Sequence, residues 1–243
     1  MKKIYSIFLS GILLFTAMGS TGVSQVKAAE VVQQQQVVLN NEEVAQLKRN
    51  LTELGIDDKT QNELIDKYNK GEIWDSMNPN KIKQVTSNLK LTAKNPVQKF
   101  TFPDGSVLQV KATVLNEKVI NTKQNINEIL PASSKECGSG YCKVYDVLVD
   151  GTSGVQSAEF RADFVHVQGG YDYISEIYDW RIVVIGGSYS LNEFTINRPK
   201  EDKRRSAQAT LKWTMTTIGG AGGATSYLRL HVQNDDWSVE GSM

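Results

Sequence analysis

The chain has 243 residues, of which 40% are hydrophobic and 22% charged, with 27 basic and 27 acidic side chains. Basic residues form no patch or long run, so the sequence excludes the electrostatic footprint of a nucleic-acid-binding protein. Length alone permits one or two domains with a sizeable core.

Residues 1–28 follow the order of a secretory signal peptide. Lys2 and Lys3 precede a short apolar run, and small residues around Ala28 suit cleavage there. The run is shorter than the roughly 20 residues of a membrane-spanning helix. We therefore expect a secreted, extracellular protein with no transmembrane segment in the mature chain. Loss of Lys2, Lys3 and Lys27 with the signal leaves 27 − 3 = 24 basic against 27 acidic residues.

A short helical hairpin is predicted over residues 41–95, after a glutamine-rich, disordered lead-in over 29–40. Asn40 or Asn41 is the expected cap of the first helix and Gly55 its end. Its apolar positions have helical spacing: Val44, Leu47, Leu51 and Leu54.

The second helix of this hairpin is expected to begin at Asp57 or Asp58 and to end at Gly71. If Asp58 is the cap, Gln61 stands where it completes a capping box. Trp74 and Met77 follow in a short linking segment. We expect these two large apolar side chains to fill the open end of the helical hairpin.

A β-hairpin and a polar connector are predicted over residues 96–136. Pro103 and Gly105 suit a tight turn between two strands. The second strand alternates apolar and polar residues up to Val114.

These segments carry a family resemblance. The order GIDDKTQNELIDKYNKGEIWDSMNP, then TFPDGSV, then a β-rich region resembles a group of uncharacterised secreted proteins from Gram-positive bacteria. In that group a short helical segment ending in a Trp-Asp-Ser-Met-Asn-Pro-like motif precedes a β-sandwich domain of unknown function. The resemblance covers most of the expected mature chain. It implies an extracellular location and a fold, and it offers no catalytic residue.

Cys137 and Cys142 are the only cysteines in the sequence. In an exported chain, an even number of cysteines favours a disulfide. A redox pair usually has a Cys-x-x-Cys spacing, which this pair lacks, and a metal site needs further ligands nearby. We therefore predict a structural disulfide.

Residues 137–243 have the alternation of an antiparallel β-sandwich, with a small barrel as the second architecture. The organising hairpin lies within 205–233, with a glycine-rich tip. Another strand places Ala158, Phe160, Ala162 and Phe164 on one face, while Val144, Asp146, Leu148 and Asp150 are expected to share a face in the strand before it. Residues 182–185 are expected in a central strand. The predicted fold class is therefore mainly β with a small α part.

The predicted function is non-enzymatic binding of an envelope component, a glycan or another protein. The ligand-binding candidates are aromatic residues among acidic ones: Tyr171, Tyr173, Tyr178 and Trp180. Such aromatics equally seal a sandwich, because they are large apolar groups. One alternative is a bacteriocin-like, membrane-active factor that uses the tip at residues 219–224. Another is a glycan hydrolase that uses acids within residues 172–179, since glycosidases need two carboxylates.

No cofactor or metal site is predicted. His166 and His231 both suit ordinary positions in a sheet, and neither has a metal-ligand spacing. The run Asn234-Asp235-Asp236 contains oxygen ligands that calcium accepts, but three such residues in a row are more typical of a solvated turn.

Overall fold

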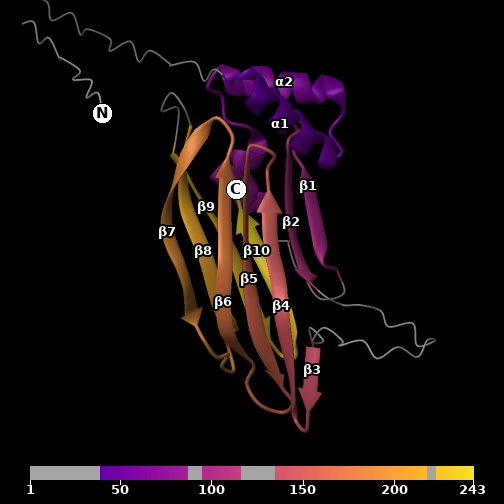
Figure 1. Cartoon of the computed structure of the whole chain (residues 1–243), viewed down its shortest axis with the longest axis vertical. Coiled ribbons are helices and arrows are strands. Elements are labelled where there is room, and N and C mark those ends of the chain that lie inside the picture. Colours follow the sequence, from indigo (N-terminus) through magenta and orange to yellow (C-terminus); the bar gives the residue numbers. More distant parts are fainter. Residues whose placement is uncertain (1–38, 87–94, 116–134, 218–222) are drawn as a thin grey trace, which may run out of the picture. The chain divides into compact units, whose positions relative to one another are not determined.

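Two antiparallel β-sheets make up most of the protein (Figure 1), and the computed structural model describes residues 39–86, 95–115, 135–217 and 223–243. In this part of the chain, one sheet has the order β1-β2-β4-β5-β6 with β3 paired to β4, and the other has the order β10-β9-β8-β7. The first sheet contains β1 (Val97–Thr101), β2 (Val107–Val114), β3 (Lys135–Gly138), β4 (Tyr141–Thr152), β5 (Gln156–Val167) and β6 (Tyr173–Val184). The second contains β7 (Gly187–Arg198), β8 (Ala207–Thr217), β9 (Gly223–Gln233) and β10 (Asp236–Ser242). This confirms the predicted mainly β class with a small α part.

The inner faces of the two sheets form the main core. The predicted alternation is confirmed in β5, where Phe160 and Phe164 are fully buried, and in β8, where Leu211 and Trp213 are fully buried. Trp213 Nε1 donates a hydrogen bond of 2.9 Å to the buried Gln156 Oε1, which satisfies the indole within the core. The hairpin of residues 205–233 therefore supplies two central strands of the second sheet, while most of its predicted tip lies outside the described residues.

The predicted alternation of β4 is wrong at one point. A bulge between Val144 and Val147 shifts the register, and Asp146 adopts a φ of 56°. The buried residues of this part of β4 are therefore Val144, Val147 and Val149. Asp146, which was expected on the same face as Val144, is not among them. One extra residue in a strand reverses the parity of everything beyond it.

The segment 182–185 was also misplaced by the sequence prediction. Its strand, β6, is an edge strand and not a central one. Ile182 is buried, whereas Val183 is 42% exposed. An apolar run is therefore insufficient evidence for a central strand, because an edge strand also needs one buried face.

The helices precede the sheets in sequence: α1 (Asn41–Glu53), α2 (Asp58–Asn69), the 3-10 helix η1 (Asp75–Met77) and α3 (Pro79–Thr86). Asn40 caps α1 and forms a capping box with Glu43. Asp57, not Asp58, caps α2, so Gln61 instead donates to the carbonyl of Ile56. The predicted ends are confirmed by the positive φ of Gly55 and Gly71, 66° and 77°.

Helix α3 was not predicted from its polar sequence. Pro79 stands at its first position, where a missing N–H has no cost, and the Asn78 side chain accepts a hydrogen bond from Asn80 N. Its Ile82 is buried against the main core. Pro79 is therefore the first residue of a helix.

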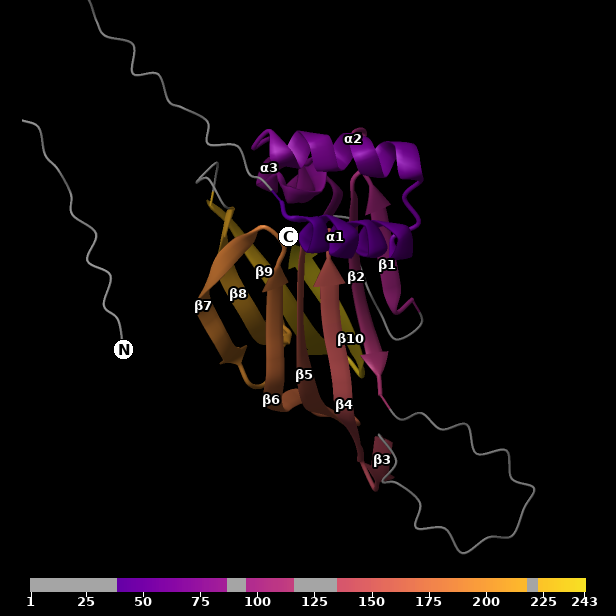
Figure 2. The ribbon, with the colours of Figure 1, turned by 45° about the horizontal axis from the view of Figure 1, so that its top comes forward.

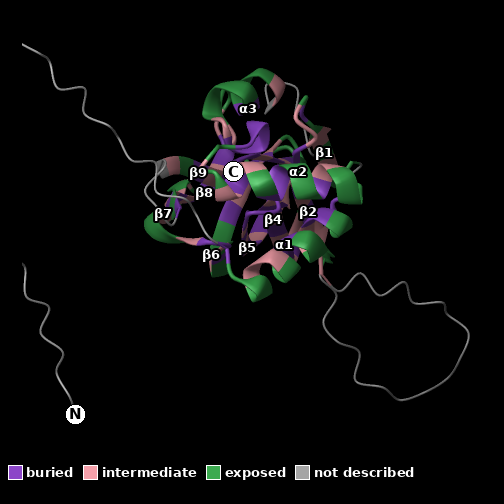
Figure 3. Ribbon diagram, turned by 90° about the horizontal axis from the view of Figure 1, so that it is seen from above, coloured by how far each residue is buried: buried purple, intermediate pink, exposed green. Residues whose placement is uncertain are grey.

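The helices pack on one end of the sandwich (Figure 2), and their outer faces are exposed while the residues beneath them are buried (Figure 3). Tyr68 Oη donates to the carbonyl of Ile185, at 2.9 Å, and Asn50 Nδ2 donates to the carbonyl of Gly154, at 2.9 Å. Trp74 is fully buried, and its Nε1 donates to the carbonyl of Leu64. We call this region, defined by Asn50, Tyr68, Trp74 and their partners, the closed end.

The predicted segment boundaries need one adjustment. The hairpin of β1 and β2 belongs to the six-stranded sheet, so the sandwich begins there and not at residue 137. Leu39, at the end of the predicted lead-in, is buried against the helices. The predicted signal peptide at 1–28 lies outside the described residues.

Candidate functional site

The four aromatic residues chosen from the sequence do not form one surface. Tyr171 precedes β6 and is 41% exposed, while Tyr173 opens β6 and makes an isolated antiparallel bridge with Lys200. Tyr178 lies farther along the strand, beside Arg161 of β5. Of the four, only Trp180 belongs to the exposed apolar surface described below.

The side chains of Tyr178 and Trp180 lie on opposite faces of the six-stranded sheet. Tyr178 Oη donates to Asp163 Oδ1 at 3.0 Å, and Asp163 lies between the inward-facing Ala162 and Phe164. Burial and this hydrogen bond raise the pKa of Tyr178. Tyr178 therefore belongs to the outer face, where it is held in a polar network.

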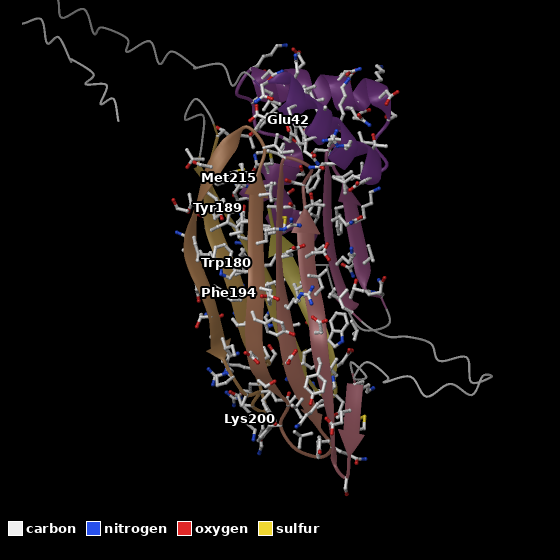
Figure 4. The ribbon with its side chains drawn as sticks, in the orientation of Figure 1. Glu42, Trp180, Tyr189, Phe194, Lys200 and Met215 are labelled. Carbon is white, nitrogen blue, oxygen red and sulfur yellow. A yellow bond between two sulfur atoms is a disulfide. The ribbon has the colours of Figure 1, made fainter. Side chains whose placement is uncertain are left out.

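Trp180 lies on the inner face. Its ring centroid is 6.4 Å from that of Phe194 on β7, and Phe194 makes an edge contact with the fully buried Phe160 at 5.9 Å. Trp180 thus continues the core outward, yet it remains 37% exposed. Figure 4 labels Trp180, Phe194, Tyr189 and Met215 along β6, β7 and β8.

Two residues of β7 share this situation. Tyr189 pairs with Met215, and Leu191 pairs with Trp213. Both partners point into the core, so Tyr189 and Leu191 have inner-face parity. Tyr189 and Leu191 are nevertheless 39% and 42% exposed. The reason is that β6 and β7 belong to different sheets and are not hydrogen-bonded to each other, so the sandwich is open along these two strands.

We call Trp180, Tyr189, Leu191 and Phe194 the open edge. It lies where β6 and β7 each end their sheet, and within the described residues neither pairs with a further strand, apart from the Tyr173–Lys200 bridge. Four of the eight exposed large apolar side chains are on these two strands, when Val183 is included. Exposed apolar groups gathered on unpaired edges are typical of an interaction surface.

Bulges limit the regular part of each edge. In β6 the pairing is continuous from Arg181 to Val184, and in β7 from Gly187 to Leu191. Beyond these stretches the register shifts, and Asp179 adopts a φ of 50°. Each edge therefore offers a short, regular stretch beside the turn that joins the strands. The sequence pattern indicated Trp180 but not Tyr189 and Leu191, because their alternation is equally that of a buried strand.

Of the acids proposed for a glycan hydrolase, Asp172 is held in a hydrogen-bonded turn. Asp172 is 1% exposed, and its carboxylate accepts hydrogen bonds from His166 Nδ1 at 2.9 Å, from Val167 N and from Asp235 N. This carboxylate anchors a turn, because its oxygens are already bonded to three donors. Glu176 and Asp179 are exposed on β6.

His166, Asp172 and Asp235 also offer ligand atoms within 4.8 Å of one another. The ring nitrogen of His166 and the carboxylate of Asp172 bind each other in this group. The turn between β9 and β10 completes it, with positive φ at Asn234 and Asp235. The arrangement is that of a hydrogen-bonded turn, so it supports the structural interpretation of His166 and of the Asn234–Asp236 run.

One carboxyl group near the closed end, that of Asp150, has a pKa above its usual value. Burial raises the pKa of Asp150 to about 6, Lys111 opposes this rise, and Glu159 adds to it. Asp150 and Glu159 are cross-strand partners beside a hollow of about 210 Å³, which α1 also lines. Sequence analysis did not single out either acid.

The remaining predictions concern the cysteines and the membrane. Cys137 and Cys142 form the predicted disulfide, and they pair directly across β3 and β4. No helix in the described ranges is long and apolar enough to cross a bilayer. The proposed membrane-active tip, residues 219–224, lies largely outside the described residues.

Comparisons with known proteins add little to this picture. No protein-family model matches the chain, and no curated protein matches it. Among solved structures, a hypothetical protein from Listeria monocytogenes EGD-e is similar over 65% of this chain and 97% of its own, with 12% identity and a TM-score of 0.30.

Proposed function

We propose that this protein is a secreted binding protein that takes an extended segment of a protein partner along the open edge. The observation that carries the proposal is the coincidence of two unpaired edge strands with exposed inner-face residues, Trp180, Tyr189 and Leu191. An added strand would receive main-chain hydrogen bonds from β6 or β7 and apolar contacts from these side chains.

The chemistry of the open edge favours a protein over a glycan. Trp180 contacts Phe194, and Leu191 of the same inner-face group is aliphatic. Sugar-binding surfaces rely on free aromatic faces and polar groups, whereas aliphatic side chains beside a strand edge suit alternate residues of a bound peptide. The partner is expected in the envelope of a Gram-positive bacterium, in accordance with the sequence resemblance.

Co-sedimentation with purified Gram-positive cell walls tests this proposal. The walls are used untreated or after protease digestion, and anionic liposomes form a separate arm. We expect pelleting with untreated walls only. Leu191→Lys should weaken binding at least about tenfold, because a charge would enter the apolar contact. Val97→Lys is the matched control, since Val97 is 44% exposed on β1, the edge strand of the six-stranded sheet at the other end from β6.

The other outcomes would contradict the proposal in distinct ways. Equal binding to protease-treated walls would show a glycan ligand. Pelleting with liposomes would favour the membrane-active alternative. Equal losses in both lysine variants, or no pelleting in any arm, would remove the open edge as the binding surface.

A further inference from the structure

A second group of polar side chains lies on the outer face of the four-stranded sheet. His231 of β9 stands between the fully buried Leu230 and Val232, so its imidazole has outward parity. Glu240 of β10 shares this face, opposite Arg229. Ser206 directly precedes β8. Three strands of one rigid sheet therefore position the group.

The geometry is that of a nucleophile, a base and a carboxylate in a row. Ser206 Oγ lies 2.8 Å from His231 Nδ1, a hydrogen-bond distance. On the other side of the ring, His231 Nε2 lies 3.8 Å from Glu240 Oε1, an ion-pair distance that is too long for a hydrogen bond. Glu240 Oε1 is also bonded to Arg229 Nη1, so Glu240 acts on the imidazole through its charge and not through a hydrogen bond. A hydroxyl hydrogen-bonded to an imidazole that faces a carboxylate is the arrangement that activates serine.

The three side chains line a hollow of about 400 Å³. The His231 side chain is 24% exposed and that of Glu240 is 36% exposed, so solvent and a small molecule reach both. The other lining residues are mostly polar: Gln233, Asn234, Asp236, Trp237 and Ser238. Trp237 is 6% exposed, and the accessible wall of the hollow combines polar groups with a larger share of carbon surface.

Electrostatics favour the orientation that catalysis needs. His231 and Arg229 hold the pKa of Glu240 below its usual value, against the effect of burial. Glu240 is therefore an anion at neutral pH, and it attracts the N–H of the imidazole to Nε2. Nδ1 is then left as the acceptor of the Ser206 hydroxyl proton.

We propose that Ser206, His231 and Glu240 form an acyl-ester hydrolase site. In the first step Ser206 Oγ attacks the carbonyl carbon of the ester, and its proton passes to His231 Nδ1. The bond from the carbonyl carbon to the alcohol oxygen then breaks, and the alcohol leaves with that proton. Water next attacks the acyl-serine, again with His231 as base, and releases the carboxylic acid and the free serine.

The hollow indicates the substrate class. Its size suits a short acyl group on a small alcohol, and its wall offers carbon surface to the acyl group and polar side chains to the alcohol. This activity is independent of the open edge, because it uses the outer face of β8, β9 and β10.

A fluorophosphonate probe tests the nucleophile in the chain from residue 29 onward. We expect one covalent adduct by intact-protein mass spectrometry, located at Ser206 by peptide mapping. Ser206→Ala should abolish it, and Ser190→Ala, at an exposed position of β7, should retain it. No adduct, or an adduct that persists in Ser206→Ala, would overturn the proposal.

Hydrolysis of p-nitrophenyl acetate tests the other two roles. His231→Gln should lower kcat about 100-fold or more, as expected for loss of a general base. Glu240→Gln should lower kcat and the labelling rate with KM unchanged, and Glu240→Asp should restore part of both. Thermal unfolding verifies that each variant is folded. Activity in Ser206→Ala or in folded His231→Gln that equals the parent would refute the assignment.

Discussion

Aromatic side chains of the same type are buried at the closed end and exposed at the open edge. Trp74 is fully buried under the helices, whereas Trp180 is 37% exposed between β6 and β7. Tyr68 is 2% exposed and bonded to the carbonyl of Ile185, whereas Tyr189 is 39% exposed. In each pair, the first side chain lies beneath a covering element and the second continues the core to a side that no other described element covers. Stability is therefore expected to reside at the closed end, and binding at the open edge.

The tryptophan pair gives the largest expected effect. Trp74→Ala should destabilise the protein by about 3–5 kcal/mol, because it leaves a cavity and removes the buried hydrogen bond to the Leu64 carbonyl. Trp180→Ala should cost at most about 2 kcal/mol, since much of that ring already contacts water. Urea unfolding of both variants measures the difference. Equal losses would show that the open edge is as much a part of the core as the closed end.

Asp150 gives a pH-dependent effect near the closed end. Its folded pKa of about 6 exceeds the usual value of 3.8 because the carboxyl is buried. The folded state then holds this proton more tightly than the unfolded chain, so this group makes stability fall as pH rises from about 4 to about 6. Asp150→Asn should therefore stabilise the protein at pH 7 by up to about 3 kcal/mol, with little effect near pH 4.

Unfolding curves between pH 4 and pH 7 measure this change. Asp179→Asn is the control, because the Asp179 side chain is 72% exposed on β6 and its partner Arg161 is 4.0 Å away. We expect its pH profile to match that of the parent protein. A parent profile that is equally stable at both pH values would contradict the burial of Asp150.

The tyrosine pair gives the smallest effect. Tyr68→Phe removes the hydrogen bond from α2 to the Ile185 carbonyl and should cost about 1–2 kcal/mol. Tyr189→Phe, at the open edge, should change stability by less than about 0.5 kcal/mol. The two urea midpoints give the comparison. A loss in Tyr189→Phe as large as that in Tyr68→Phe would remove the distinction between the two regions.

Much of the fold was predictable because its signals are local. Alternation identified β5 and β8, and caps and glycines placed α1 and α2 close to their observed ends. The candidate site was predictable only at Trp180. The bulge at Asp146 depends on hydrogen bonds with Asp163 and Arg161 of the neighbouring strand β5. The local sequence of β4 therefore did not predict it.

The sequence by itself determined the mainly β class, the helical hairpin and the cysteine pair, because periodicity, caps and spacing act over a few residues. Only the tertiary structure decided that β6 and β7 are edges, that Tyr189 and Leu191 stay exposed, and that Ser206 meets His231. These facts depend on which strands pair and how the sheets meet. An inner-face residue has the same alternation whether the opposite sheet covers it or leaves it to solvent, so the pattern alone does not distinguish a core from a binding surface.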